Sequence, residues 1–212
     1  MSSTDTPQTG SDRRKRSDAR RNAQTLLDAA AAVFARAGVD APVREIAAEA
    51  GVGMGTVYRH FPTRPDLVVA VFRHQVDALA ATPTSASGED LETPYAVLRS
   101  WVARFTDFLV TKHGLAEALH SDQAGYESLH AEFVDRLVPV LDQLLRAAVD
   151  AGQIRADVRP LDLMIAIGNL CIGAGTFPGY RARHMVDVLL AGLAHGAPGS
   201  TDGDEPRTRT GA

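Results

Sequence analysis

Apolar residues recur every three or four positions along most of this chain, and no segment alternates strictly between apolar and polar residues. The first pattern places apolar side chains on one face of a helix, whereas strict alternation would indicate a strand. We therefore predict an all-α fold with about nine helices. The expected helices cover residues 26–37, 43–50, 54–60, 66–79, 94–111, 115–120, 127–151, 160–173 and 181–193.

The two ends of the chain differ from this helical middle. Residues 1–17 and 197–212 are rich in Ser, Thr, Asp, Gly and Arg, and such low hydrophobicity predicts disorder. The first of these ends carries a basic cluster at residues 13–16. This basic arm could contact nucleic acid, or it could be a solvated tail that aids solubility.

Composition argues against several classes of protein. The single cysteine, Cys171, cannot form an intramolecular disulfide, and it argues against a cysteine-based zinc site. No apolar run is long enough to cross a membrane, and the polar first residues are unlike a signal peptide. No catalytic spacing or phosphate-binding loop is present. We expect a cytoplasmic protein that is not an enzyme and uses no cofactor or metal.

The stretch EIAAEAGVGMGTVYRHF, residues 45–61, says most about function. Ile46 and Ala47 lie on one side of a short helix, and Ala47 is small enough to let a second helix approach. Gly51 comes four residues later, where a helix can end in a left-handed residue. Val57 then provides an apolar contact in the next helix. This pattern predicts a helix-turn-helix, which places its second helix in the major groove of DNA.

The second helix of this pair carries side chains suited to DNA. Hydroxyl and imidazole groups can bind phosphates, arginine can pair with phosphate or read guanine, and glycine lets the backbone approach closely. Arg64 comes at the start of the following helix, where its charge and the amide groups favour an anion. The candidate DNA-binding residues are Arg44, Gly55, Thr56, Tyr58, Arg59, His60 and Arg64.

Basic and acidic residues are distributed unevenly between the two parts of the chain. Residues 1–80 carry 11 basic and 9 acidic residues, a balance of +2. Residues 81–212 carry 11 basic and 17 acidic residues, a balance of −6. The basic excess therefore lies in the part that contains the predicted helix-turn-helix, as expected for a nucleic-acid-binding end.

The same region resembles the N-terminal domain of the TetR family of bacterial repressors. The matching stretch is LLDAAAAVFARAGVDAPVREIAAEAGVGMGTVYRHFPTRPDLVVAVF. It contains the family's A-G helix end, its R-E-I-A-x-x-A-G-V core, its G-T-V-Y-R-H-F helix and the Pro/Arg/Leu start of its fourth helix. The chain departs from the family at Pro42, Gly53 and Met54, where polar residues are common, and at Arg64, where lysine is common. One or two phosphate contacts of the family are therefore in doubt.

The resemblance implies two domains and a homodimer. The helix-turn-helix domain would cover residues 18–64, and an effector-binding and dimerisation domain would cover residues 65–196. TetR-like proteins pair through their last two helices, and the corresponding segments here are strongly apolar, although they could simply face their own core. The candidate dimer residues are Leu163, Ile167, Leu170, Val186, Leu189 and Leu190.

Family members also bind a small effector between the helices of the C-terminal domain. Aromatic residues on two helices could form an apolar pocket with a few polar groups, or they could be plain core. The candidate pocket residues are Trp101, Phe105, Phe108, His120, Tyr126, His130 and Asn169.

We therefore predict a homodimeric DNA-binding regulator that represses from a palindromic operator. A small, largely apolar effector would release it. One alternative is a DNA-binding regulator without a small-molecule ligand. The other is a helical protein-interaction module whose helix-turn-helix is only structural.

Overall fold

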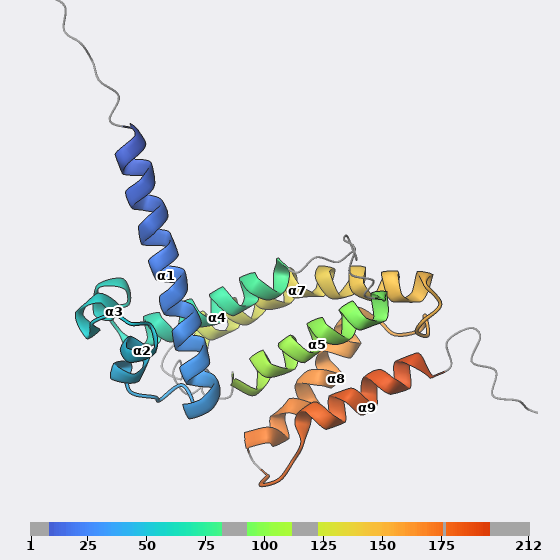
Figure 1. Cartoon of the computed structure of the whole chain (residues 1–212). Coiled ribbons are helices and arrows are strands. Elements are labelled where there is room, and N and C mark those ends of the chain that lie inside the picture. The colour runs from blue at the N-terminus through green and yellow to red at the C-terminus, as the bar shows by residue number, and fades with distance from the viewer. Residues whose placement is uncertain (1–8, 82–92, 112–122, 176, 196–212) are drawn as a thin grey trace, which may run out of the picture. The chain divides into compact units, whose positions relative to one another are not determined.

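The computed structural model describes residues 9–81, 93–111, 123–175 and 177–195 of the chain. All regular structure in these ranges is helical, which confirms the predicted class (Figure 1). The predicted helix at 115–120 lies outside the described residues. The helices are α1 (Thr9–Ala37), α2 (Val43–Glu49), α3 (Met54–His60), α4 (Arg64–Ala80), α5 (Pro94–Thr111), α7 (Gln123–Asp150), α8 (Pro160–Ile172) and α9 (Ala182–Ala194), with a 3-10 turn at Gly173–Gly175.

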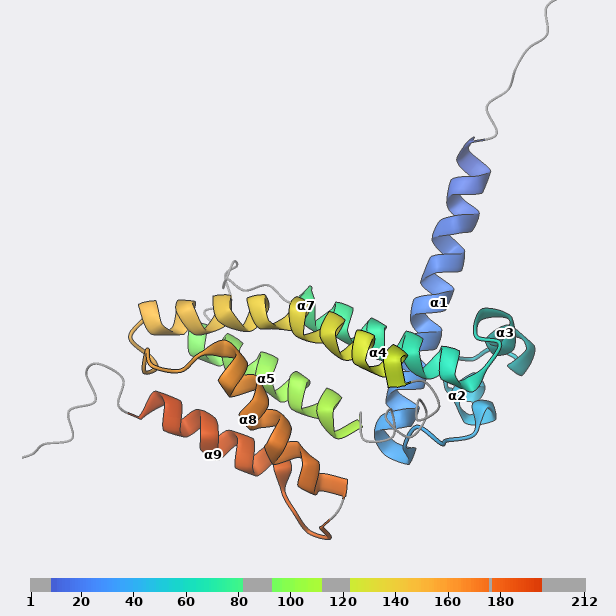
Figure 2. The same ribbon diagram turned by 180° about the vertical axis from the view of Figure 1, so that it is seen from behind.

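Helix α1 is longer than predicted. It begins at Thr9, so residues 9–17 are helical and the expected disordered arm is wrong for them. Arginine and lysine make this segment strongly polar, but both have high intrinsic helix propensity. Figures 1 and 2 show the first half of α1 extending beyond α2 and α3. Among the side chains that the structure describes, the buried ones of α1 begin at Leu26.

The chain divides into two compact units, each with its own core. Of the described residues, the first unit holds 9–77, 111 and 123–126. Within it α1 packs on α2, and α2 packs on α3. Gly38, at φ +78, ends α1 in the left-handed conformation predicted for it. The buried side chains of this unit include Leu26, Val33, Phe34, Ile46, Val57, Leu67, Val71 and Phe72.

Helix α4 has a capping box at its start. The amide and the hydroxyl of Thr63 donate to Oδ2 of Asp66 at 3.0 and 2.7 Å. The amide of Asp66 donates back to Oγ1 of Thr63 at 3.3 Å. These reciprocal bonds satisfy amides that the first helical turn leaves without partners. They explain why α4 begins at Arg64, two residues before the predicted start.

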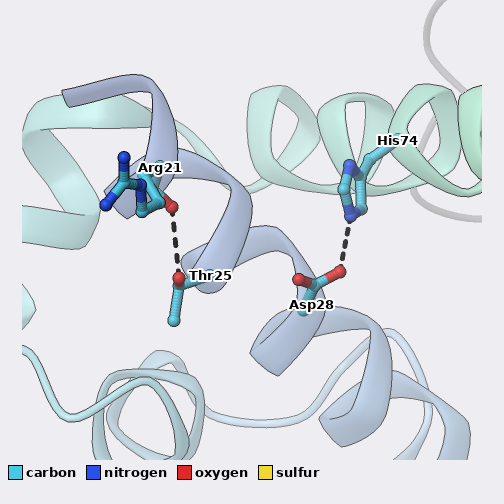
Figure 3. Close-up of polar contacts among 4 residues, drawn as sticks. All are labelled: Arg21, Thr25, Asp28 and His74. Atoms are coloured by element: carbon cyan, nitrogen blue, oxygen red, sulfur yellow. Dashed lines mark hydrogen bonds and ion pairs between the residues drawn. The ribbon is translucent and has the colours of Figure 1, made fainter. Parts of the chain in front are cut away.

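Helices α1 and α4 are joined within the first unit. Nε2 of His74 on α4 lies 2.6 Å from Oδ1 of Asp28 on α1 (Figure 3). In the preceding turn of α1, the Thr25 hydroxyl donates to the Arg21 carbonyl at 3.1 Å. An open groove of about 640 Å³ lies between the two helices. None of the predicted pocket residues lines it. Its lining residues are Ala23, Gln24, Leu27, Pro65, Asp66, Val69, Ala70, Arg73, His74 and Asp77.

The second unit is built from α5, α8, α9 and most of α7. Of the described residues it holds 78–81, 93–110, 127–175 and 177–195. Helices α8 and α9 lie side by side (Figures 1 and 2). Tyr95 of α5 donates its hydroxyl hydrogen to the Leu190 carbonyl of α9 at 2.8 Å, and an ion pair joins Asp107 and Arg183 on the same two helices. The core includes Leu98, Trp101, Phe105, Leu137, Leu141, Leu144, Ile154, Leu163, Ile167 and Leu190.

The predicted boundary between residues 64 and 65 stays a prediction. It falls at the start of α4, which is one continuous helix, and the two compact units divide later in that helix, between Asp77 and Ala78. Helix α7 continues through Pro139 and ends before Gly152, which has φ +66, as expected for a helix stop. None of the helices in the described ranges combines the length and the apolar character needed to cross a membrane.

Candidate functional site

The turn between α2 and α3 has the predicted construction. The amide of Val52 bonds the carbonyl of Ala47 at 2.9 Å and closes the end of α2. Gly51 takes φ +67, a conformation that glycine adopts at little cost. Gly53 follows in extended backbone and is the N-cap of α3. The turn is therefore tight because its glycines permit it.

Helix α3 is buried on one side and open on the other. Val57 is its only buried residue and packs into the core of the first unit. Tyr58, the next residue, is 51% exposed. The remaining predicted contact residues of this helix also lie at the surface, with Thr56 half-buried and Gly55, Arg59 and His60 exposed. Hydroxyl, guanidinium and imidazole groups thus share one outward-facing short helix.

Two arginines carry uncompensated charge on this surface. Within the part of the chain that the structure describes, neither Arg44 of α2 nor Arg59 of α3 forms an ion pair, and both are exposed. Arg36, by contrast, pairs with Glu49 at 2.8 Å. An unpaired guanidinium can bind a phosphate with two parallel hydrogen bonds. Arg44 and Arg59 are therefore available to an anionic partner in a way that Arg36 is not.

Gly55 is not required by the packing of the protein. It lies within α3 without a positive φ, and a Cβ built on it would meet no atom within 4 Å. A glycine inside a helix costs stability, so a reason outside the fold is needed. Close approach of another molecule to this backbone is such a reason, and it agrees with the prediction made from the sequence.

Arg64 is the first residue of α4, as predicted, but its side chain is engaged by the protein itself. Its side chain turns back to the α1–α2 loop, where Nη2 donates to the carbonyls of Val39 and Ala41. The guanidinium carbon also lies 5.9 Å from the centre of the Phe34 ring. Arg64 is half-buried in this position. Its strongest contacts are with backbone carbonyls, which the spacing of residue types could not reveal.

The aromatic residues predicted for a pocket form one packed cluster. The ring of Trp101 stacks on Phe105 with centroids 5.3 Å apart, and Phe133 of α7 lies 5.9 Å from Phe105 and 5.7 Å from Phe108. Trp101 is 0% exposed, and its Nε1–H donates to the Leu79 carbonyl in the last turn of α4 at 3.0 Å. These residues therefore pack against one another in the core of the second unit.

Of the polar residues predicted for the pocket, the structure describes the side chains of His130 and Asn169. His130 is exposed, with its ring centroid 5.7 Å from that of Phe133. Asn169 is exposed on α8, and its part in a pocket stays a prediction. The polarity of Asn169 marks the outward side of that helix. His120 and the side chain of Tyr126 lie outside what the structure describes.

The residues predicted for the dimer interface mostly face the core of their own unit. Leu163, Ile167, Val186 and Leu190 are buried, and Leu170 and Leu189 are half-buried. Apolar residues lie on both sides of α8 and α9, so periodicity could not tell which of them are covered. The exposed large apolar residues of these two helices are Leu161, Ile165, Ile172, Met185 and Val188.

Titratable groups of the second unit show no sign of a reactive site in the residues that the structure describes. Burial raises the pKa of the Cys171 thiol to about 11, so the thiol stays protonated at neutral pH. Burial also raises the pKa of Tyr95, whose hydroxyl is bonded to a carbonyl. In the described ranges, no three His, Cys, Asp or Glu side chains lie close enough to hold a metal ion together.

Two protein-family models match the chain. Residues 26–71 match the family described as bacterial regulatory proteins, tetR family. Residues 93–195 match the C-terminal domain of SbtR-like transcriptional regulators. The first match covers the turn, α3 and the start of α4. The second covers all of α5, α8 and α9.

Known proteins of similar sequence and structure agree with both models. The HTH-type transcriptional regulator SrpR of Pseudomonas putida is 30% identical over 166 residues, which is 74% of this chain and 73% of that protein. A TetR transcriptional regulator from Streptomyces coelicolor is 35% identical, with a TM-score of 0.67 over 80% of this chain and 97% of the other. A TetR regulatory protein from Mycobacterium vanbaalenii is 33% identical, with a TM-score of 0.60 over 84% and 98%.

Proposed function

Because this chain belongs to the TetR family of bacterial transcriptional regulators, we propose that it is a repressor which binds a palindromic operator as a homodimer and leaves it when a small effector binds. The observation that carries the proposal is the surface of α3. Its one buried residue anchors the helix, and every other predicted contact residue on it reaches solvent.

The exposed side of α3 has the chemistry to read a major groove. Arg59 can pair with a phosphate or with the O6 and N7 atoms of guanine. Thr56 and Tyr58 offer hydroxyl groups to phosphate oxygens, and Thr56 also offers a methyl group to thymine. Gly55 leaves its backbone uncovered beside them. Arg44 on α2 adds a phosphate contact at the edge of the groove.

The second unit supplies the dimer interface through the outward side of α8 and α9. Ile165 and Ile172 on α8 are 53% and 61% exposed, and Val188 on α9 is 52% exposed. A cluster of exposed large apolar residues marks an interaction surface, and a second copy of the same surface completes a twofold interface. Two reading helices related by this axis would fit half-sites about one helical turn, roughly 34–36 Å, or somewhat more apart.

The effector acts on the second unit, where α4 ends. Trp101 holds the Leu79 carbonyl of α4 and belongs to the aromatic cluster of that unit. A largely apolar ligand that separates the rings would disturb this hydrogen bond. The protein would then shift toward a conformation in which α4 no longer supports the operator-binding arrangement. Effector binding would lower the affinity for the operator, and operator binding would lower the affinity for the effector by the same factor.

Two alanine variants test the DNA-binding part of this proposal. The operator is first recovered from genomic DNA fragments with the wild-type protein, and its affinity is measured at several salt concentrations. Arg59→Ala should lose about 1–3 kcal/mol of binding free energy, and its salt slope should be shallower by about 1 if Arg59 binds a phosphate. Tyr58→Ala should also weaken binding.

The control is Arg146→Ala. Arg146 is an exposed arginine of the second unit that pairs with Asp142 of its own helix at 2.8 Å. Its substitution should change neither affinity nor salt slope. If Tyr58→Ala and Arg59→Ala bind as tightly as the wild type while remaining folded, α3 is not the reading helix.

A further inference from the structure

Arg64 joins two parts of the chain that lie on either side of the helix-turn-helix. Its Nη2 donates to the Ala41 carbonyl at 2.8 Å and also to the Val39 carbonyl. Both acceptor residues are buried and belong to the loop that leads into α2. Arg64 itself is the first residue of α4. One guanidinium therefore closes a loop of chain that contains the whole of α2, the turn and α3.

The contact uses a feature of arginine that lysine lacks, the flat face of its guanidinium. The planar guanidinium reaches two carbonyls and at the same time faces the Phe34 ring at 5.9 Å. A lysine ammonium carries the same charge, but it is compact and not planar, and it has no flat face to lie over the Phe34 ring while it reaches the two carbonyls. A lysine would keep an electrostatic attraction for DNA while it gives up most of the interaction with the loop.

The surroundings of Arg64 do not favour a phosphate. The carboxylate of Asp66 already accepts the amide and hydroxyl of Thr63, so the first turn of α4 carries a negative charge where an anion would approach. Arg64 is half-buried, whereas Arg44 and Arg59 are exposed. The N–H groups of Nη2 are already bonded to the carbonyls of Val39 and Ala41, so they are not available to a phosphate.

We propose that Arg64 is a positioning residue for operator binding, which holds α2 and α3 in their reading geometry by tying the start of α4 to residues 39 and 41. The inference rests on the proposed function and adds a route for its regulation. Helix α4 carries this clamp at its first residue and continues into the second unit at its last turn. A displacement of α4 would strain the clamp and loosen the loop before α2.

The test compares Arg64→Lys and Arg64→Gln with the wild type on the selected operator. Because recognition needs side chains held within about 0.5 Å, Arg64→Lys should weaken binding by at least about tenfold, although its charge is unchanged. The slope of log affinity against log salt should stay at the wild-type value. Arg59→Gln provides the contrast, since removal of a true phosphate contact makes the slope shallower by about 0.9.

Three results would overturn the inference. Wild-type affinity in Arg64→Lys combined with a shallower slope in Arg64→Gln would make Arg64 a phosphate contact. Wild-type behaviour of both variants would make it dispensable. Unchanged amide hydrogen exchange at residues 38–41 in DNA-free Arg64→Lys would show that no clamp has been removed, because we expect faster exchange there.

Two further outcomes have different consequences for the proposal. If the wild type itself binds no DNA, the proposed function fails, which is distinct from failure of the clamp. If either Arg64 variant loses its helical circular dichroism, Phe34→Leu replaces it, since this change removes the ring beneath the guanidinium and keeps an apolar side chain. The clamp then predicts weaker binding at the wild-type salt slope, and unchanged affinity would overturn it.

Discussion

The glycines around α3 serve different purposes. Gly51 has φ +67, which a residue with a side chain adopts only with strain. Gly55 lies in helical backbone, and a Cβ there would meet no atom within 4 Å. A methyl group would therefore strain the fold at Gly51, whereas at Gly55 it would only occupy space on the side proposed to face DNA. Alanine substitutions at these two glycines therefore distinguish an effect on folding from an effect on DNA recognition.

Gly51→Ala should lower the free energy of unfolding of the protein by about 1–2 kcal/mol, the cost of a left-handed conformation for an ordinary residue. Urea unfolding followed by circular dichroism measures this loss. An unfolding midpoint equal to that of the wild type would mean that the turn between α2 and α3 does not depend on the left-handed glycine.

Gly55→Ala should have the opposite effect on stability. Alanine in a helix is favoured over glycine by roughly 0.5–1 kcal/mol, so the free energy of unfolding should rise. Operator affinity, measured by fluorescence anisotropy, should nevertheless fall because the new methyl group lies between the backbone and the duplex. A variant that is both more stable and equally tight on DNA would show that the duplex does not approach Gly55.

Sequence reasoning predicted the parts of the site that depend on residues close together in the chain. A small residue, a glycine four positions later and an apolar residue in the next helix are enough to predict the turn, and the structure confirms it at Ala47, Gly51 and Val57. Arg64 shows the limit of that reasoning. Its partners are backbone carbonyls of residues 39 and 41, which every sequence has, so only the fold could reveal the contact.

At the scale of the elements, periodicity located α8 and α9 but not their outward sides. Ile165 and Ile167 are both apolar, yet one is 53% exposed and the other is buried. A helix that is apolar all round has no polar stripe to mark its surface. Asn169 on the same helix is polar and exposed, so it indicates the outward side of α8.

The outward side of α8 and α9 is tested by placing a charge on it. Ile165→Asp should convert the dimer to monomers, because an unpaired carboxylate in an apolar interface is costly to desolvate. Light scattering coupled to size-exclusion chromatography measures the mass. Gln143→Asp, at an exposed polar position of α7, is the control and should leave the dimer intact. A dimer that persists in Ile165→Asp would place the interface elsewhere.

At the scale of the whole molecule, α4 connects the two proposed activities. Its first residue holds the loop before the helix-turn-helix, and Trp101 holds the Leu79 carbonyl in its last turn. The fold class, the approximate positions of the helices in the described ranges other than the start of α1, and the family could be predicted from sequence, since each depends on a local pattern. The two attachments of α4 could not, because each joins residues distant in the chain.

The single tryptophan of the chain provides a fluorescence test of the proposed effector site. Trp101 is fully buried and bonded through its indole nitrogen, so a ligand that separates the aromatic cluster should change its fluorescence intensity and wavelength. Compounds that release the operator are expected to cause this change with a matching concentration dependence. Release of the operator with no change in tryptophan emission would place the effector away from the aromatic cluster.

The central claim is that α3 reads a specific DNA sequence. It is tested most directly by incubating the purified protein with fragmented genomic DNA at several salt concentrations and sequencing what is retained, with Arg59→Ala carried through in parallel. The wild type should enrich one short palindrome, and Arg59→Ala should enrich it far less. If the wild type enriches no common sequence at any salt concentration, or if Arg59→Ala enriches the same palindrome equally well, the claim is contradicted.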